Sequence, residues 1–147
     1  MSQSTDQRVT NDLLETLEDG RKGFSDAAEK LRDSDQPDIA TTFARFAEQR
    51  AGFITELKGL AADYGDVVDD SGSTGGAVHR GWISLKDALT GSDHRHVVSA
   101  ALTGEKHAVS EFQKALDDDI SPTLRTVVER QLAAITAARD EVDALSD

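Results

Sequence analysis

Glutamates near the centres of helical segments are the residues of this chain best suited to chemistry, because such carboxylates bind iron or manganese in helical bundles. In di-iron proteins a Glu comes from each of two helices, and a Glu-x-x-His motif comes from each of the other two. The glutamates near segment centres in this sequence are Glu18, Glu48, Glu105 and Glu129. An iron or manganese site is therefore the first hypothesis that the sequence raises.

Histidines do not stand at the spacing that a di-iron site needs. The residues three positions after Glu48, Glu105 and Glu129 are two alanines and a leucine, so none of these glutamates begins a Glu-x-x-His motif. The best remaining pair is His107 and Glu111, which lie four apart on one helix face but beside its apolar stripe. Metal binding through the central glutamates and this pair stays the alternative interpretation.

Motifs of other enzyme classes are missing from the sequence. There is no cysteine, which excludes a thiol nucleophile and thiolate metal ligands. The stretch "GSTGG" lacks the Gly-Lys-Ser/Thr of a phosphate-binding loop. No serine has the strand-turn-helix setting of a nucleophile elbow. We expect the protein to be non-enzymatic.

The elements that must position these residues are helices. Apolar residues recur at alternating spacings of four and three, which is typical of amphipathic helices, and no segment alternates as a strand does. Examples of these stripe residues are Leu13, Leu17, Phe24, Phe43, Leu57, Val98, Phe112, Val128 and Ile135. The expected helices span roughly residues 6–33, 37–64, 93–118 and 122–146, with a shorter one at 76–90.

Local signals mark several of the expected helix ends. "STDQ" at Ser4 to Gln7 reads as a capping box, and Pro37 suits the first turn of the second long helix. Ser92 is the expected cap of the third long helix, and Ser121 followed by Pro122 is the expected start of the last one.

Helices of this length indicate a four-helix bundle that forms a single domain over residues 1–147. Short turns make hairpins of the first two long helices and of the last two. The long middle connection can return along the bundle, which places the third long helix parallel to the second, as in ferritin-like folds. Trp82, in the short helix of this crossover, is expected to cover the outside of the bundle.

One residue that breaks the apolar stripe stands near the middle of each long helix: Gly20, Arg50, Glu105 and Gln131. Because antiparallel packing brings helix midpoints to one level, we expect them to form a polar layer inside the core. Arg50 would pair with Glu105, Gln131 would donate and accept hydrogen bonds, and Gly20 would leave room. A guanidinium keeps its charge and would stand where the metals should sit. We therefore favour a structural ion pair that fixes helix register over a metal site.

The chain is strongly acidic, with 28 Asp and Glu against 16 Lys and Arg and a net charge of −12. This balance argues against binding nucleic acid or an anionic membrane, since phosphates are bound by clustered Lys and Arg. No apolar run suits a transmembrane helix and the start does not resemble a secretory signal, so a cytoplasmic location is expected. Asp outnumbers Glu by 19 to 9, which fits either a halophilic protein of a saline cytoplasm or an ordinary acidic bacterial protein.

The stretches "GGAVHRGWISLKDALTG" and "ALTGEKHAVSEFQKAL" resemble an uncharacterised bacterial family, domain of unknown function 2383. The resemblance extends from about Thr10 to Leu145, and Trp82 and the Gly104-Glu105 pair are among its most family-like residues. It implies a ferritin-like four-helix bundle and supplies no catalytic residues or metal ligands.

The lead expectation is a soluble, non-enzymatic helical bundle without a cofactor. Its role would be associated with stress or with binding a protein partner or a second copy of itself through its helix faces. The alternative is a degenerate ferritin-like protein that still binds iron or another divalent metal at its central carboxylates.

Overall fold

The computed structural model of the chain describes residues 2–63, 81–82, 84–91 and 93–146. Within these residues the chain is all α-helical. The helices are α1 (Ser2–Arg32), α2 (Pro37–Asp63), the short α3 (Leu85–Thr90), α4 (His94–Asp117) and α5 (Pro122–Leu145). The four long helices are those that the apolar periodicity predicts.

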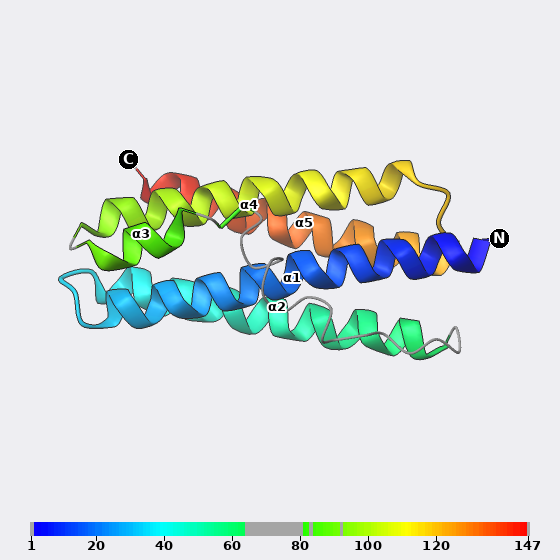
Figure 1. The fold of residues 1–147 in the computed structure, drawn as a ribbon, viewed down its shortest axis with the longest axis horizontal. Coiled ribbons are helices and arrows are strands. Elements are labelled where there is room, and N and C mark those ends of the chain that lie inside the picture. The colour runs from blue at the N-terminus through cyan, green and yellow to red at the C-terminus, as the bar shows by residue number, and fades with distance from the viewer. Residues whose placement is uncertain (1, 64–80, 83, 92, 147) are drawn as a thin grey trace.

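The long helices form a bundle with one long crossover (Figure 1). Helices α1 and α2 form one antiparallel hairpin, α4 and α5 form another, and α4 runs parallel to α2. Helix α1 packs against α2 and α4, and α5 packs against α4 and α2. Helices α2 and α4 therefore stand at opposite corners of the bundle. This is the connectivity of ferritin-like folds, as the sequence predicts.

The core consists of two apolar clusters, one toward each end of the bundle. The first contains Phe24, Phe43, Phe46 and Trp82. The second is formed by side chains of all four long helices, among them Leu13, Leu17, Leu57, Phe112, Leu124 and Ile135. On α1, α2 and α4 the boundary between the clusters falls at Gly20, Arg50 and Glu105. These residues mark the middle of the bundle.

Two of the predicted helix starts differ from the observed ones. Helix α1 already begins at Ser2, so the stretch from Ser4 to Gln7 lies inside the helix and is not its cap. The N-cap of α4 is Asp93, whose side chain accepts a hydrogen bond from the backbone N–H of Arg95. The predicted cap, Ser92, lies outside the described residues.

The other two starts agree with the prediction. Helix α2 begins at Pro37. At α5, Ser121 is the N-cap and accepts a hydrogen bond from the N–H of Leu124, and Pro122 occupies the first turn. A proline costs little there because the first-turn N–H groups have no partner within the helix.

The short helix α3 is shorter than the expected 76–90. Within the described residues it begins at Leu85, whose N–H donates to the carbonyl of Trp82. Gly81 has a φ of +67°, a left-handed conformation that interrupts a right-handed helix. Residues 76–80 of the expected helix lie outside the described residues.

Candidate functional site

Arg50 and Glu105 form an ion pair in the centre of the bundle. Arg50 Nη1 donates to Glu105 Oε1 and Arg50 Nη2 donates to Glu105 Oε2, each at 2.6 Å. Both residues are 0% exposed. The pairing that the sequence predicts is thus present, with two parallel hydrogen bonds of the kind that an Arg fork and a carboxylate make.

The geometry satisfies most of the hydrogen-bonding groups of these two charges. Arg50 Nε donates to the side chain of Gln49 at 3.1 Å, so all three guanidinium nitrogens have a partner. Both carboxylate oxygens of Glu105 accept from the same guanidinium. Removing charges from water costs several kcal/mol per ion, and that cost is offset only where the pairing is this complete.

Helix α1 shapes the space that the guanidinium occupies. A Cβ on Gly20 would lie 3.2 Å from Arg50 Nη1, so glycine leaves the room that Arg50 fills. One turn further along, the Phe24 ring lies 5.4 Å from Arg50 Cζ, within the range of a cation–π contact.

Gln131 is fully buried but binds α2 instead of the ion pair. Its Nε2 donates to Glu56 Oε1 at 2.9 Å and to the carbonyl of Phe53 at 3.4 Å, and its Oε1 is buried without a partner. Val128 and Ile135, which flank it on α5, belong to the second apolar cluster. Gln131 therefore lies on that side of the ion pair.

Glu56 accepts hydrogen bonds from both the buried Gln131 and the exposed Arg130. The hydrogen bond from Arg130 lowers the pKa of Glu56, and the hydrogen bond from Gln131 acts in the same direction against the opposing effect of burial. Glu56 thus carries its negative charge at neutral pH and fixes the amide of Gln131.

Trp82 is inserted between α1 and α4. It is 5% exposed and belongs to the first apolar cluster, so it does not lie over the outside of the bundle as expected. A Cβ on either Gly23 of α1 or Gly104 of α4 would overlap the indole ring. The rings of Trp82 and Phe24 meet edge to face, with centroids 5.0 Å apart and an interplanar angle of 75°. We call the space between Gly23 and Gly104 the glycine slot.

Sequence reasoning did not identify the glycine slot. Its only sequence signal is the presence of Gly23 and Gly104 inside long helices, where glycine costs about 1 kcal/mol relative to alanine. Neither of them faces solvent, so a packing reason was to be expected.

The glutamates of the alternative metal site are not brought together. Glu48 and Glu129 are exposed, and Glu18 pairs with Arg21 at the surface of α1. Only Glu105 faces the middle of the core, where both of its oxygens accept from Arg50. Among the described residues there is no group of three or more His, Cys, Asp or Glu that could hold a metal ion.

His107 and Glu111 also differ from a metal-binding pair. Glu111 pairs with Lys114 at 3.4 Å. His107 is half-buried against the turn at Gly81, where a Cβ would overlap its side chain, and its Nε2 is buried without a partner. The two residues therefore face different surroundings.

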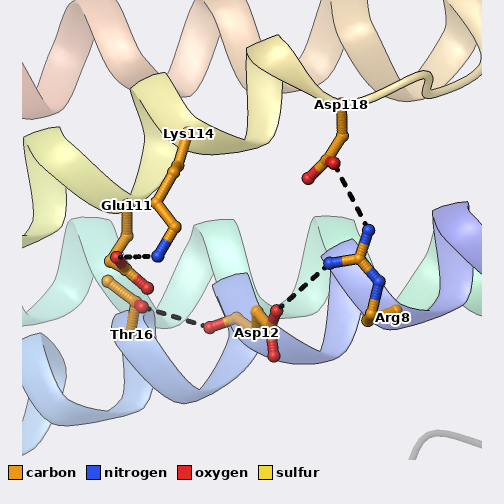
Figure 2. Close-up of polar contacts among 6 residues, drawn as sticks. All are labelled: Arg8, Asp12, Thr16, Glu111, Lys114 and Asp118. Atoms are coloured by element: carbon orange, nitrogen blue, oxygen red, sulfur yellow. Dashed lines mark hydrogen bonds and ion pairs between the residues drawn. The ribbon is translucent and has the colours of Figure 1, made fainter.

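Figure 2 shows the groove between α1 and α4 to which Glu111 belongs. Arg8 Nη1 lies 3.9 Å from Asp12 Oδ2 on the same helix, α1, and Arg8 Nη2 lies 3.4 Å from Asp118 Oδ1. On α4, Lys114 pairs with Glu111. The cavity here is only about 50 Å³. Since exposed ion pairs of this kind contribute little stability, we interpret the groove as a solvated seam between two helices.

A buried carboxylate of α1 caps α5. Asp6 is 3% exposed, and its Oδ1 accepts a hydrogen bond of 2.9 Å from the N–H of Ser121. Arg125 ties the preceding turn by donating to the carbonyls of Leu116 and Asp118. The first and last helices are thus joined at this end of the bundle.

Comparison with known families gives one match. A family model described as a domain of unknown function, DUF2383, matches residues 7–118. The matched region includes α2 and α4 with the ion pair, Trp82 and both glycines of the slot, and it ends before α5. A search of curated proteins finds no significant match.

Proposed function

The chain belongs to the DUF2383 family, and we propose that it is a non-enzymatic, ferritin-like bundle that acts by binding another protein, or a second copy of itself, through its outer helix faces. The observation that carries this proposal is the buried pair of Arg50 and Glu105. It occupies the centre of the bundle, which is the part of a ferritin-like fold where chemistry takes place.

The ion pair holds the central carboxylate against a buried cation, which a metal ion would have to displace. Metal ions bind to carboxylate oxygens, and both oxygens of Glu105 are engaged by a cation that stays protonated. A divalent metal would need to displace the guanidinium and leave it buried without a partner, which costs several kcal/mol. This supports a structural role for the core over the alternative of iron or manganese binding.

Because the core is occupied by the ion pair, we place the binding function on the outer surface of the helices. With a net charge of −12, the surface repels nucleic acid and anionic lipid more than it attracts them. Electrostatic complementarity of this kind favours a protein partner that presents basic residues. None of the helices within the described residues has the length and apolarity needed to cross a bilayer.

Metal analysis of the purified protein tests the proposal. The chain is incubated with Fe(II) or Mn(II), separated from free metal, and analysed by mass spectrometry beside a Glu105→Gln variant. We expect metal far below one ion per chain in both. Near-stoichiometric metal in the wild type that is lost in Glu105→Gln would overturn the proposal in favour of the metal-binding alternative.

Light scattering over a range of protein concentrations and salt tests the surface role. We expect either assembly of the chain with itself or, for a monomer, a complex with a basic protein probe such as a Lys-rich helical peptide. A chain that stays monomeric and binds no such probe at low salt would contradict binding through acidic helix faces.

A further inference from the structure

The indole of Trp82 is held as a ligand is held in a pocket. Its ring lies between Gly23 of α1 and Gly104 of α4, where even a methyl group would overlap it, and the edge of Phe24 closes the slot. A flat ring makes extensive van der Waals contact with the two glycine backbones, and a side chain of another shape would not fit the slot as well. The glycine slot therefore selects for an aromatic ring.

The four long helices also pack through contacts that do not involve the indole. Phe24 contacts Phe43 and Phe46 of α2 at centroid distances of 5.2 and 5.3 Å. The second cluster, with Leu13, Leu57 and others from all four long helices, does not include Trp82. Loss of the indole from the slot would leave most of the core in place.

Within the described residues, the segment that carries Trp82 is attached to the long helices through the short helix α3, which buries Leu85 and Ala88 in the first cluster. Helix α3 has six residues and packs on α4 and, less closely, on α1. A helix of that length is not stable alone in water. Gly81, in the left-handed conformation directly before Trp82, is a position where the backbone can change direction at low cost.

We propose that Trp82 is a reversible latch and that the glycine slot is an exchangeable binding site for an aromatic ring. The indole leaves the slot while the four long helices stay packed, and the vacated slot accepts an aromatic side chain or indole-like ligand in its place. This inference goes beyond the proposed function and does not depend on it.

The position of the slot gives the latch a consequence for the core. Phe24 contacts both the indole and the Arg50 guanidinium, and Gly104 directly precedes Glu105 in α4. Opening the slot exposes the ring that covers the guanidinium and brings solvent closer to the ion pair. Occupancy of the slot and the stability of the ion pair are therefore coupled.

Fluorescence measures the latch directly because Trp82 is the only tryptophan of the chain. The full-length protein is titrated with urea, and the emission maximum is compared with helix content from far-UV circular dichroism. We expect the emission to shift to the red before helix content falls, which is the sign of a local opening. Coincident transitions would overturn the latch, since the indole would then leave only on global unfolding.

Substitution of the slot glycines provides the matched variants. Gly23→Ala and Gly104→Ala place a methyl group in the space of the ring, so we expect red-shifted emission and stronger acrylamide quenching with helix content retained. Gly52→Ala and Gly59→Ala on α2 are the controls, because a Cβ there meets no atom within 4 Å. Unchanged emission in both slot variants would contradict the slot. If these variants fail to fold, the urea titration of the wild type still shows whether the indole leaves the slot before the helices unfold.

Chemical rescue tests whether the slot binds a ring. In Trp82→Ala the slot is vacated, and apolar cavities of this kind bind free aromatic molecules. We expect added indole to raise the melting temperature of Trp82→Ala, to raise that of the wild type much less because Trp82 competes for the slot, and to have a smaller effect in Trp82→Ala combined with Gly104→Ala than in Trp82→Ala alone. An equal effect of indole on all three proteins, or none on Trp82→Ala, would overturn the ring site.

Discussion

Arg50 and Glu105 are hydrogen-bonded across the diagonal of the bundle, from α2 to α4, although the main packing partners of both helices are α1 and α5. A contact between opposite corners must pass through the axis of the bundle. That explains why both side chains are completely buried and why the pair separates the two apolar clusters. It also means that the pair is sensitive to any shift of α2 or α4 along its own axis.

Removing one partner should destabilise the protein strongly. Glu105→Ala leaves the Arg50 guanidinium buried without its carboxylate, and we expect the free energy of unfolding to fall by about 3–5 kcal/mol. Urea unfolding followed by circular dichroism measures the loss. An exposed glutamate, Glu129→Ala, is the control and should change stability by no more than about 0.5 kcal/mol. A similar, small loss in both variants would contradict the buried pairing.

Removing both partners should cost much less than the two single losses together. With Arg50→Leu and Glu105→Met combined, no buried charge is left unpaired, and apolar replacements of a buried ion pair are often neutral or stabilising. A double-mutant cycle with the two single substitutions gives the coupling. Additive losses would show that the two side chains stabilise the fold independently.

Replacing Gly20 by a residue with a side chain should destabilise the protein, because glycine leaves the space that Arg50 fills. The Cβ of Gly20→Ala would lie 3.2 Å from Arg50 Nη1, and the two hydrogen bonds to Glu105 prevent the guanidinium from moving away. Overpacking costs about 1–3 kcal/mol and the better helix propensity of alanine returns about 1, so we expect a net loss of about 1 kcal/mol. Gly52→Ala, in open space on α2, should instead gain about 0.5–1 kcal/mol. A gain at both positions in thermal unfolding would contradict the tight fit around Arg50.

Asp6 should contribute more to the free energy of unfolding than an exposed carboxylate of the same helix does. Asp6→Ala removes the acceptor for the N–H of Ser121, and we expect a loss of about 1–2 kcal/mol in unfolding experiments. Asp6→Asn keeps an acceptor oxygen and should recover most of that loss. Asp12→Ala, which breaks only an exposed pair with Arg8, should change stability by no more than about 0.5 kcal/mol. Equal effects of Asp6→Ala and Asp12→Ala would argue against the cap.

The N-cap of α4 should lose its stabilising effect when the Asp93 carboxylate is protonated at low pH. Hydrogen bonds from the Arg95 side chain and from its backbone N–H lower the pKa of Asp93 from 3.8 to about 2. A lowered pKa in the folded state contributes stability above pH 3.8, and this contribution is lost as the pH falls from 3.8 toward 2. NMR titration of the Asp93 carboxyl group measures the pKa. In Arg95→Ala we expect it to rise but to stay below 3.8, because the backbone hydrogen bond remains. An Asp93 pKa that does not change in Arg95→Ala would contradict the assignment.

The helices and the ion pair could be predicted because both depend on the pattern within single helices. Apolar spacing defines the buried face of each helix. A charge such as Arg50 on that face must find an opposite charge, and Glu105 was the only acidic residue in an equivalent position. The partner of Gln131 was not predictable in the same way. It depends on the axial position of α5 against α2, because Glu56 lies six residues after Arg50, less than two turns further along α2.

The glycine slot and the cap by Asp6 depend on tertiary packing alone. The periodicity around Trp82 predicts a short helix but not what the indole contacts, and its place is fixed by Gly23 and Gly104 lying opposite each other on α1 and α4. Asp6 lies in the stretch from Ser4 to Gln7 that the sequence suggests as a capping box of the first helix, yet the N–H that it binds belongs to Ser121, 115 residues away. No local rule connects residues at such separations.

The bond between Asp6 and Ser121 has a consequence for the order of events during translation. Ser121 follows Asp6 by 115 residues, so during synthesis the carboxylate stays hydrated until α5 emerges from the exit tunnel of the ribosome. A nascent chain that still lacks α5 exposes the apolar faces that Leu124 and Ile135 later cover. Chaperones that shield such surfaces are therefore expected to act on this protein mainly before α5 is complete.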